Sequence, residues 1–176
     1  MAAGGHFIFE LFKIAILSAA YATILLWIKF ALNLKKGGTR FSWSKFFRIY
    51  LILYSVLFLF SFTYYGDHGL GDECKIPLGH GETMSSADLD AYFAPKEGGN
   101  LIDIKSYLIS NNDLCAATDS GYLVYNLKTG KRIEFDNSQE YRLYALGNTL
   151  PNPDLFLDFF KQYDNYWSGW RFWTMP

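Results

Sequence analysis

Potential metal ligands are concentrated in the stretch 66–82, which reads GDHGLGDECKIPLGHGE. Imidazole and carboxylate groups of this kind bind zinc or calcium. The candidate ligands are His68, Asp72 and His80. Their spacing matches no metal motif, and the glycines and the proline are more typical of an irregular, solvated loop. We therefore expect no cofactor, and metal binding is the alternative.

Three tryptophans gather near the C-terminus, at positions 167, 170 and 173, with one arginine among them. Such rings could form a stacking platform for a sugar or a peptide, and the candidate ligand-binding residues are Trp167, Trp170, Arg171 and Trp173. They could also lie at a membrane interface. The simplest interpretation is that the tail closes the core of a small domain.

The chain has two cysteines, Cys74 and Cys115. An even cysteine count in an extracytoplasmic domain predicts a disulfide between them. The alternative is two independent buried thiols. No C-x-x-C pair is present, so a cysteine-based metal site is not expected.

Motifs of the common enzyme classes are missing. The sequence has no G-x-S-x-G, no phosphate-binding loop, no dinucleotide fingerprint and no H-E-x-x-H. We therefore expect a protein that is not an enzyme.

These candidate residues must be positioned by two different parts of the chain. The first part, residues 1–65, contains two long apolar runs and predicts a transmembrane hairpin with spans at about 9–32 and 46–65. Trp27 and Trp43 mark one interface, and Tyr64 and Tyr65 mark the other. A cleaved signal peptide is the alternative for the first run.

The loop between the spans, residues 35–48, is basic and contains no acid. Short flanking loops rich in Lys and Arg stay in the cytoplasm. The sequence therefore predicts a cell (inner) membrane protein with both termini extracytoplasmic. The cations that set this topology are Lys35, Lys36, Arg40, Lys45 and Arg48.

Small residues recur at spacing four on the first run, at Ala15, Ala19 and Thr23, and again at Ser18 and Ala22. This spacing allows the backbones of two helices to approach closely. We expect this face to pack against the second helix of the same chain, or against a helix of another protein.

The second part, residues 66–176, predicts one extracytoplasmic α+β domain. Four runs with β-strand character are separated by Gly- and Asn-bearing turns and predict a four-stranded antiparallel meander: 101–109, 114–118, 122–127 and 131–135. Residues 85–95 favour a short helix, with a strand as the alternative. Two further helices are expected at 139–146 and 154–163, with the helices packed on one side of the sheet.

Charge is divided unequally between the two parts. Residues 1–65 hold seven Lys or Arg and one Glu, for a net charge of +6, and residues 66–176 hold nine Lys or Arg and sixteen Asp or Glu, for a net charge of −7. An acidic domain argues against nucleic acid as a partner. The sequence predicts a membrane-anchored envelope protein, an accessory subunit that contacts lipid and another membrane or envelope protein. The alternatives are a domain that binds a cell-wall sugar or peptide, and a metal-dependent hydrolase.

Overall fold

The computed structural model describes residues 2–33, 42–69, 73–96 and 98–176. The chain is α+β and divides into two compact units. One unit holds Met1–Asp67 together with Trp170–Pro176, and the other holds His68–Gly169. The last seven residues, which the sequence assigned to the outer domain, therefore belong to the compact unit of the N-terminal helices.

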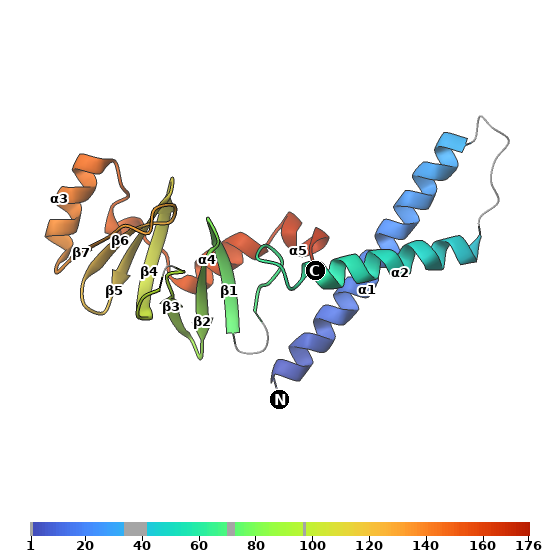
Figure 1. Ribbon diagram of the computed structural model, residues 1–176, viewed down its shortest axis with the longest axis horizontal. Coiled ribbons are helices and arrows are strands. Elements are labelled where there is room, and N and C mark those ends of the chain that lie inside the picture. The colour runs from blue at the N-terminus through green and yellow to red at the C-terminus, as the bar shows by residue number, and fades with distance from the viewer. Residues whose placement is uncertain (1, 34–41, 70–72, 97) are drawn as a thin grey trace. The chain divides into compact units, whose positions relative to one another are not determined.

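The first unit is built on two helices that contact each other, α1 (Ala2–Asn33) and α2 (Trp43–Phe60) (Figure 1). Both are long and apolar enough to cross a membrane. At 1.5 Å per residue, 18 residues of α2 extend about 27 Å, close to the ~30 Å of a hydrocarbon core. Because α2 begins at Trp43, Lys45 and Arg48 lie on the helix and not in the predicted loop. Lys35, Lys36 and Arg40 lie outside the described residues.

One stripe of α1 is buried, at Glu10, Ile14, Ser18 and Ala22. The spacing of four places these residues on one face of the helix. The hydroxyl of Ser18 donates to the carbonyl of Ile14 at 2.7 Å, so this buried polar group is satisfied. Of the other predicted packing set, Ala15 and Ala19 are half-buried and Thr23 is exposed. The most buried face of α1 is thus displaced by one residue from the face of Ala15, Ala19 and Thr23, which corresponds to a rotation of 100° around the helix axis.

The second unit is a seven-stranded antiparallel sheet in which every strand pairs with its neighbours in the sequence (Figure 1). The strands are β1 (Glu73–Gly79), β2 (Glu82–Ala87), β3 (Asp90–Phe93), β4 (Ile102–Ser110), β5 (Asp113–Thr118), β6 (Tyr122–Asn126) and β7 (Arg132–Phe135). The four predicted strands correspond to β4–β7 and are confirmed.

The prediction was wrong for β1, which replaces part of an expected loop, and for the short helix preferred at 85–95. The strand kept as the alternative for 85–95 is confirmed, since β2 and β3 lie there. In β2 the buried positions alternate along the strand, but they are Glu82, Met84 and Ser86. Two of these three are polar, so the hydrophobic period of two that reveals a strand is missing from the sequence. Asp88 and Leu89 form a two-residue turn between β2 and β3, and both have positive φ.

The sheet is strongly curved. The hydroxyl of Tyr125 on β6 donates to Glu82 on β2 at 3.1 Å, although the two strands are four positions apart. In a flat sheet, strands spaced at ~4.8 Å would separate them by about 19 Å. Phe93 on β3 and Tyr125 also have ring centroids 4.9 Å apart. The main core, which includes Met84, Phe93, Leu114 and Tyr125, therefore fills the concave side.

The helices of this unit cover both faces, which corrects the expectation of one side. The main core includes Phe159 of α4 (Phe159–Trp167), whereas a second core joins Cys115 and Val124 to Tyr141 and Ala145 of α3 (Ser138–Asn148). Successive residues of a strand face opposite sides, so β5 contributes Leu114 to one core and Cys115 to the other.

The two predicted helices are present, with different starts. The helix α3 begins at an Asn137 cap, whose side chain accepts from the backbone N–H groups of Gln139 and Glu140. Asp154 lies in a 3-10 turn, Pro153–Leu155, and α4 begins only after the Asp158 cap. The helix α4 is bonded to the sheet at two points: the Gln162 side chain donates to the carbonyl of Tyr107 on β4, and the Trp167 indole donates to the carbonyl of Lys75 on β1.

Candidate functional site

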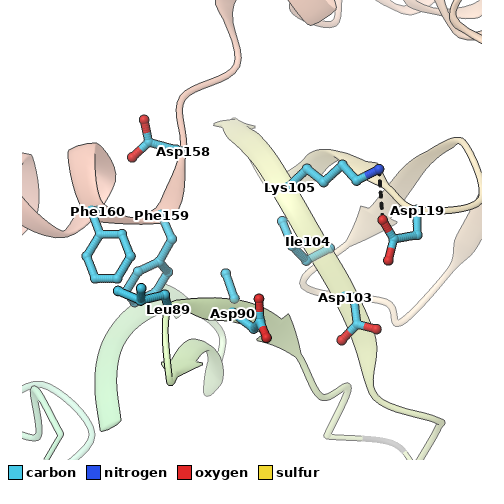
Figure 2. A pocket seen from close by; sticks show the side chains of 10 residues that line it. Leu89, Asp90, Asp103, Ile104, Lys105, Asp119, Asp158, Phe159 and Phe160 are labelled. Atoms are coloured by element: carbon cyan, nitrogen blue, oxygen red, sulfur yellow. Dashed lines mark ion pairs between the residues drawn. The ribbon is translucent and has the colours of Figure 1, made fainter. Parts of the chain in front are cut away.

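An open pocket of about 430 Å³ lies beside the β2–β3 turn, between β3, β4 and the start of α4. We call it the acidic groove. Figure 2 shows Leu89 and the aromatic pair on one side, and Lys105, Asp119 and Asp103 on the other. The residues that line it are Leu89, Asp90, Ala91, Asp103, Ile104, Lys105, Asp119, Asp158, Phe159 and Phe160.

The sheet and α4 position these side chains by ordinary rules. Asp103 and Lys105 alternate with buried Ile102 and Ile104 along β4, so their side chains are exposed. The pairing of β4 with β5 shifts register between Ile104 and Ser106, and such a bulge locally re-aims a strand. The groove therefore lies where β4 is irregular.

The charge of the groove is strongly negative. It contains four aspartates and one lysine, and that lysine is already paired, since Lys105 Nζ lies 2.8 Å from Asp119 Oδ1. Among the described residues, the carboxylates of Asp90 and Asp103 have no ion-pair or hydrogen-bond partner. The backbone N–H of Lys161 donates to Asp158 and lowers the pKa of that carboxyl. A concave surface of one charge sign raises the local concentration of the opposite charge.

The wall opposite these charges is apolar. Phe159 is buried and anchors α4 in the main core, while Phe160 is 40% exposed in the groove. Their rings meet edge to face, with centroids 5.5 Å apart. Leu89 is 80% exposed at the tip of the β2–β3 turn. An aromatic face beside carboxylates is a suitable environment for a cation attached to an apolar stem.

The lining offers carboxylates, one ammonium group and apolar side chains. In the part of the chain that the structure describes, no Ser, Cys or His side chain lines the groove, so a hydroxyl, thiol or imidazole nucleophile is not placed there. A smaller cavity of about 230 Å³ lies near β5–β7 and the end of α3. Its polar groups bond mainly to each other, as in the 2.7 Å bond from Asn126 to Asp113, and this arrangement stabilises the turn after β6.

The structure does not bring the two candidate metal-binding histidines together. The carbonyl of His68 accepts from the N–H of Lys75 at one end of β1, whereas His80 follows the other end of that strand. The five residue steps from Lys75 to His80 extend about 16 Å along the strand. His80 instead lies 3.0 Å from the side-chain oxygen of Asn112, and His68 packs edge-on against Trp167. Asp72 lies outside the described residues.

The tryptophans of the tail occupy different environments. Trp167 is part of the sheet unit and is buried, with its indole bonded to β1. Trp170 and Trp173 lie on α5 (Trp170–Thr174), are 62% and 74% exposed, and belong to the unit of the helix pair. Arg171 lies over the ring of Trp170 at 5.2 Å from its centroid. Of the three tryptophans, only Trp167 therefore lies in a domain core, as the simplest interpretation of the tail expected.

Both cysteines are free, and the predicted disulfide is not formed. Cys74 lies on β1 and packs at the main core, while Cys115 lies on β5 in the second core. The strands β1 and β5 are not neighbours, and the two thiols face opposite sides of the sheet. A disulfide requires Cα atoms within about 7 Å. Burial raises the pKa of both thiols, so neither is an activated nucleophile.

Sequence reasoning missed the groove. Its four aspartates are spread over 69 residues of the sequence, from Asp90 to Asp158. They come together only through the curvature of the sheet and the position of the start of α4. It also missed Glu82, a carboxylate only 4% exposed, which accepts from Tyr125 and from the backbone N–H of Lys96. This residue cross-links the curved sheet and is structural. Tyr107 is a core residue too, and burial raises the pKa of its hydroxyl.

Comparison with known proteins gives no match to a family model, a curated protein or a solved structure. The function must therefore be argued from the site itself.

Proposed function

We propose that this protein is a membrane-anchored envelope protein, a non-catalytic accessory subunit whose sheet unit binds another protein. The observation that carries the proposal is the surface of α2. None of its 18 residues is buried, and large apolar side chains such as Leu51, Ile52 and Leu59 are 58–66% exposed. A surface of this kind is stable in hydrocarbon and unfavourable in water.

The proposed orientation keeps the basic loop in the cytoplasm and the N-terminus outside, in the cell (inner) membrane. Lys45 and Arg48 support it, because both are exposed on the first turns of α2. The positive-inside bias then assigns the start of α2 to the cytoplasmic face. The sheet unit is extracytoplasmic in this arrangement.

The acidic groove is the proposed docking site, and its proposed occupant is a segment of a partner protein. Charge complementarity requires a Lys or Arg side chain, which would meet Asp90 and Asp103. The apolar wall at Leu89 and Phe160 favours a hydrophobic neighbour beside that cation. A free inorganic cation would leave this wall uncovered.

The groove by itself supports only weak binding. Exposed ion pairs contribute roughly 0.2–1 kcal/mol each and an exposed cation–π contact about 0.5–1 kcal/mol. Two ion pairs and one cation–π contact sum to at most about 3 kcal/mol, which falls short of the ~4 kcal/mol that corresponds to a 1 mM dissociation constant. Confinement of both proteins to one membrane raises the effective concentration, and this makes weak contacts sufficient. The anchor and the groove therefore support one function.

The test uses full-length protein, purified in mild detergent after chemical cross-linking in membranes. We expect a defined partner to co-purify with the wild type and to be lost from an Asp90→Asn/Asp103→Asn variant. The matched control is Asp136→Asn/Asp164→Asn, which removes the same two charges from exposed positions outside the groove. Recovery of the monomer alone, or equal recovery of the partner with both variants, contradicts the proposal.

A further inference from the structure

The short C-terminal helix α5 contacts α1 within the helical unit. The hydroxyl of Tyr21 donates to the backbone carbonyl of Thr174 at 2.7 Å. Eight residues earlier on α1, the Lys13 ammonium lies 5.0 Å from the centroid of the Phe172 ring. These two contacts attach α5 to a length of α1 of about 12 Å.

The position of Tyr21 determines how deep this attachment lies. The apolar segment of α1 runs from Gly5 to Leu32, and a helix needs about 20 residues to cross the hydrocarbon core. Every stretch of 20 residues within Gly5–Leu32 contains Tyr21 in its interior. Wherever α1 crosses the bilayer, Tyr21 is therefore inside it, and the end of α5 bonded to Tyr21 is inside as well.

Three carbonyls of α5 have hydrogen-bond partners within the protein, as a medium without water requires. The last carbonyls of a helix have no partner within it, and in hydrocarbon each must be satisfied by the protein. The carbonyl of Thr174 receives the Tyr21 hydroxyl, and the Thr174 hydroxyl donates to the carbonyl of Trp170 at 2.8 Å. The N–H of Met175 donates to the carbonyl of Arg171 at 2.9 Å.

The outward surface of α5 is aromatic. Trp170 is 62% exposed, Phe172 45% and Trp173 74%, and the last two rings meet edge to face with centroids 5.3 Å apart. Tryptophan favours the boundary between headgroups and acyl chains. The charges of Lys13 and Arg171 are on long stems that can extend to the headgroup level from below it.

We propose that α5 is a third membrane contact, a re-entrant C-terminal segment that lies against α1 with the rings of Trp170 and Trp173 in lipid. The partner is the bilayer, and the contact fixes the end of the chain to the membrane that α1 crosses. This inference rests on the proposed function, because it requires α1 to span.

The test is quenching of tryptophan fluorescence by phosphatidylcholine with brominated acyl chains, using full-length protein in vesicles. Three proteins are compared: the wild type, Trp27→Phe, and Trp170→Phe/Trp173→Phe. The two variants are changed only at exposed rings. Because Trp27, Trp43, Trp170 and Trp173 are the exposed tryptophans, removal of the last two should lower the quenched emission by about half. Buried Trp167 remains as the unquenched background.

The two proposals fail in different ways. If the double variant loses no quenched emission while Trp27→Phe does, α1 is in lipid and α5 is not, and only this inference is overturned. If bromolipid quenches none of the three proteins, the membrane anchor and this inference both fall. As a second measurement, Tyr21→Phe removes the donor to Thr174 and should raise iodide quenching of the tail tryptophans from the water phase, whereas Tyr50→Phe on α2 should not. Equal iodide quenching in both tyrosine variants contradicts the proposed attachment.

Discussion

Replacement of Tyr125 by Phe tests the curvature of the sheet. The change deletes one hydroxyl, which donates to the buried carboxylate of Glu82 on β2. Both residues are almost fully buried, at 2% and 4% exposure. The substitution keeps the aromatic ring and its contact with Phe93, so the core volume is nearly unchanged.

The expected loss follows from the charge of the acceptor. A hydrogen bond to a charged group contributes about 1.5–3 kcal/mol to the free energy of unfolding. Glu82 retains the backbone N–H of Lys96 at 3.1 Å, so we expect a value near 2 kcal/mol. For a domain of up to ~100 residues this lowers Tm by roughly 10 °C.

The control is Tyr92→Phe. It removes the same atom from a bond of 3.4 Å to Glu73 that is only part-buried, and should cost under about 0.5 kcal/mol. Unfolding in urea is followed by labelling of the Cys115 thiol, which is completely buried in the sheet unit and becomes reactive only when that unit opens. Equal stabilities of the two variants would refute the reasoning that a buried carboxylate holds β2 against β6.

Three further predictions follow from the same structure. Leu89→Gly should stabilise the sheet unit by about 1 kcal/mol in urea unfolding, because Leu89 has φ +75° and glycine after Asp88 suits this turn. The same change should weaken recovery of the partner, because it removes part of the apolar wall of the groove. A loss of stability would show that the turn is not strained. Asp158→Ala should lower the free energy of unfolding by about 1 kcal/mol at pH 7, because it removes the cap of α4. The pKa of Asp158 is depressed in the folded protein, so the stabilisation is present above the unfolded pKa of ~3.9 and is lost as the pH falls below that value. A penalty that stays constant from pH 7 to pH 3 would contradict this. Reductant should leave Tm unchanged, and the denatured protein should titrate two thiols, Cys74 and Cys115. A protein mass that is lower by two hydrogen atoms than that of the dithiol form would show that the disulfide is present.

The elements that the sequence predicts are those whose turns and caps are encoded by neighbouring residues. Strands β4–β7 and helix α3 were predictable, because their turns and caps are encoded within a few residues, as at Asn137. Strand β2 was hidden because Glu82 and Ser86 occupy buried positions. Their burial depends on Tyr125, 43 residues away from Glu82, and no local pattern contains that information.

The candidate site was less predictable than the fold, for the same reason. The histidines that look like a metal site are separated by the length of β1, which the sequence did not show as a strand. The acidic groove needs β3, the β4 bulge and the start of α4 to meet. The tryptophans of the tail were recognisable as unusual, but their division between a core residue and exposed rings depends on where α4 ends and α5 begins.

The most direct test of the account is the location of each part of the chain relative to the membrane. A Cys74→Ser background leaves only buried Cys115, which gives the unlabelled baseline. One cysteine is then added, either before α2 by Ser42→Cys or in the exposed β5–β6 turn by Ser120→Cys. With an impermeant maleimide on intact cells, or on spheroplasts if an outer membrane is present, the account predicts labelling at 120, and at 42 only after permeabilisation. Labelling at 42 in sealed cells, or at both positions equally, would contradict a hairpin that crosses the membrane with its sheet unit outside.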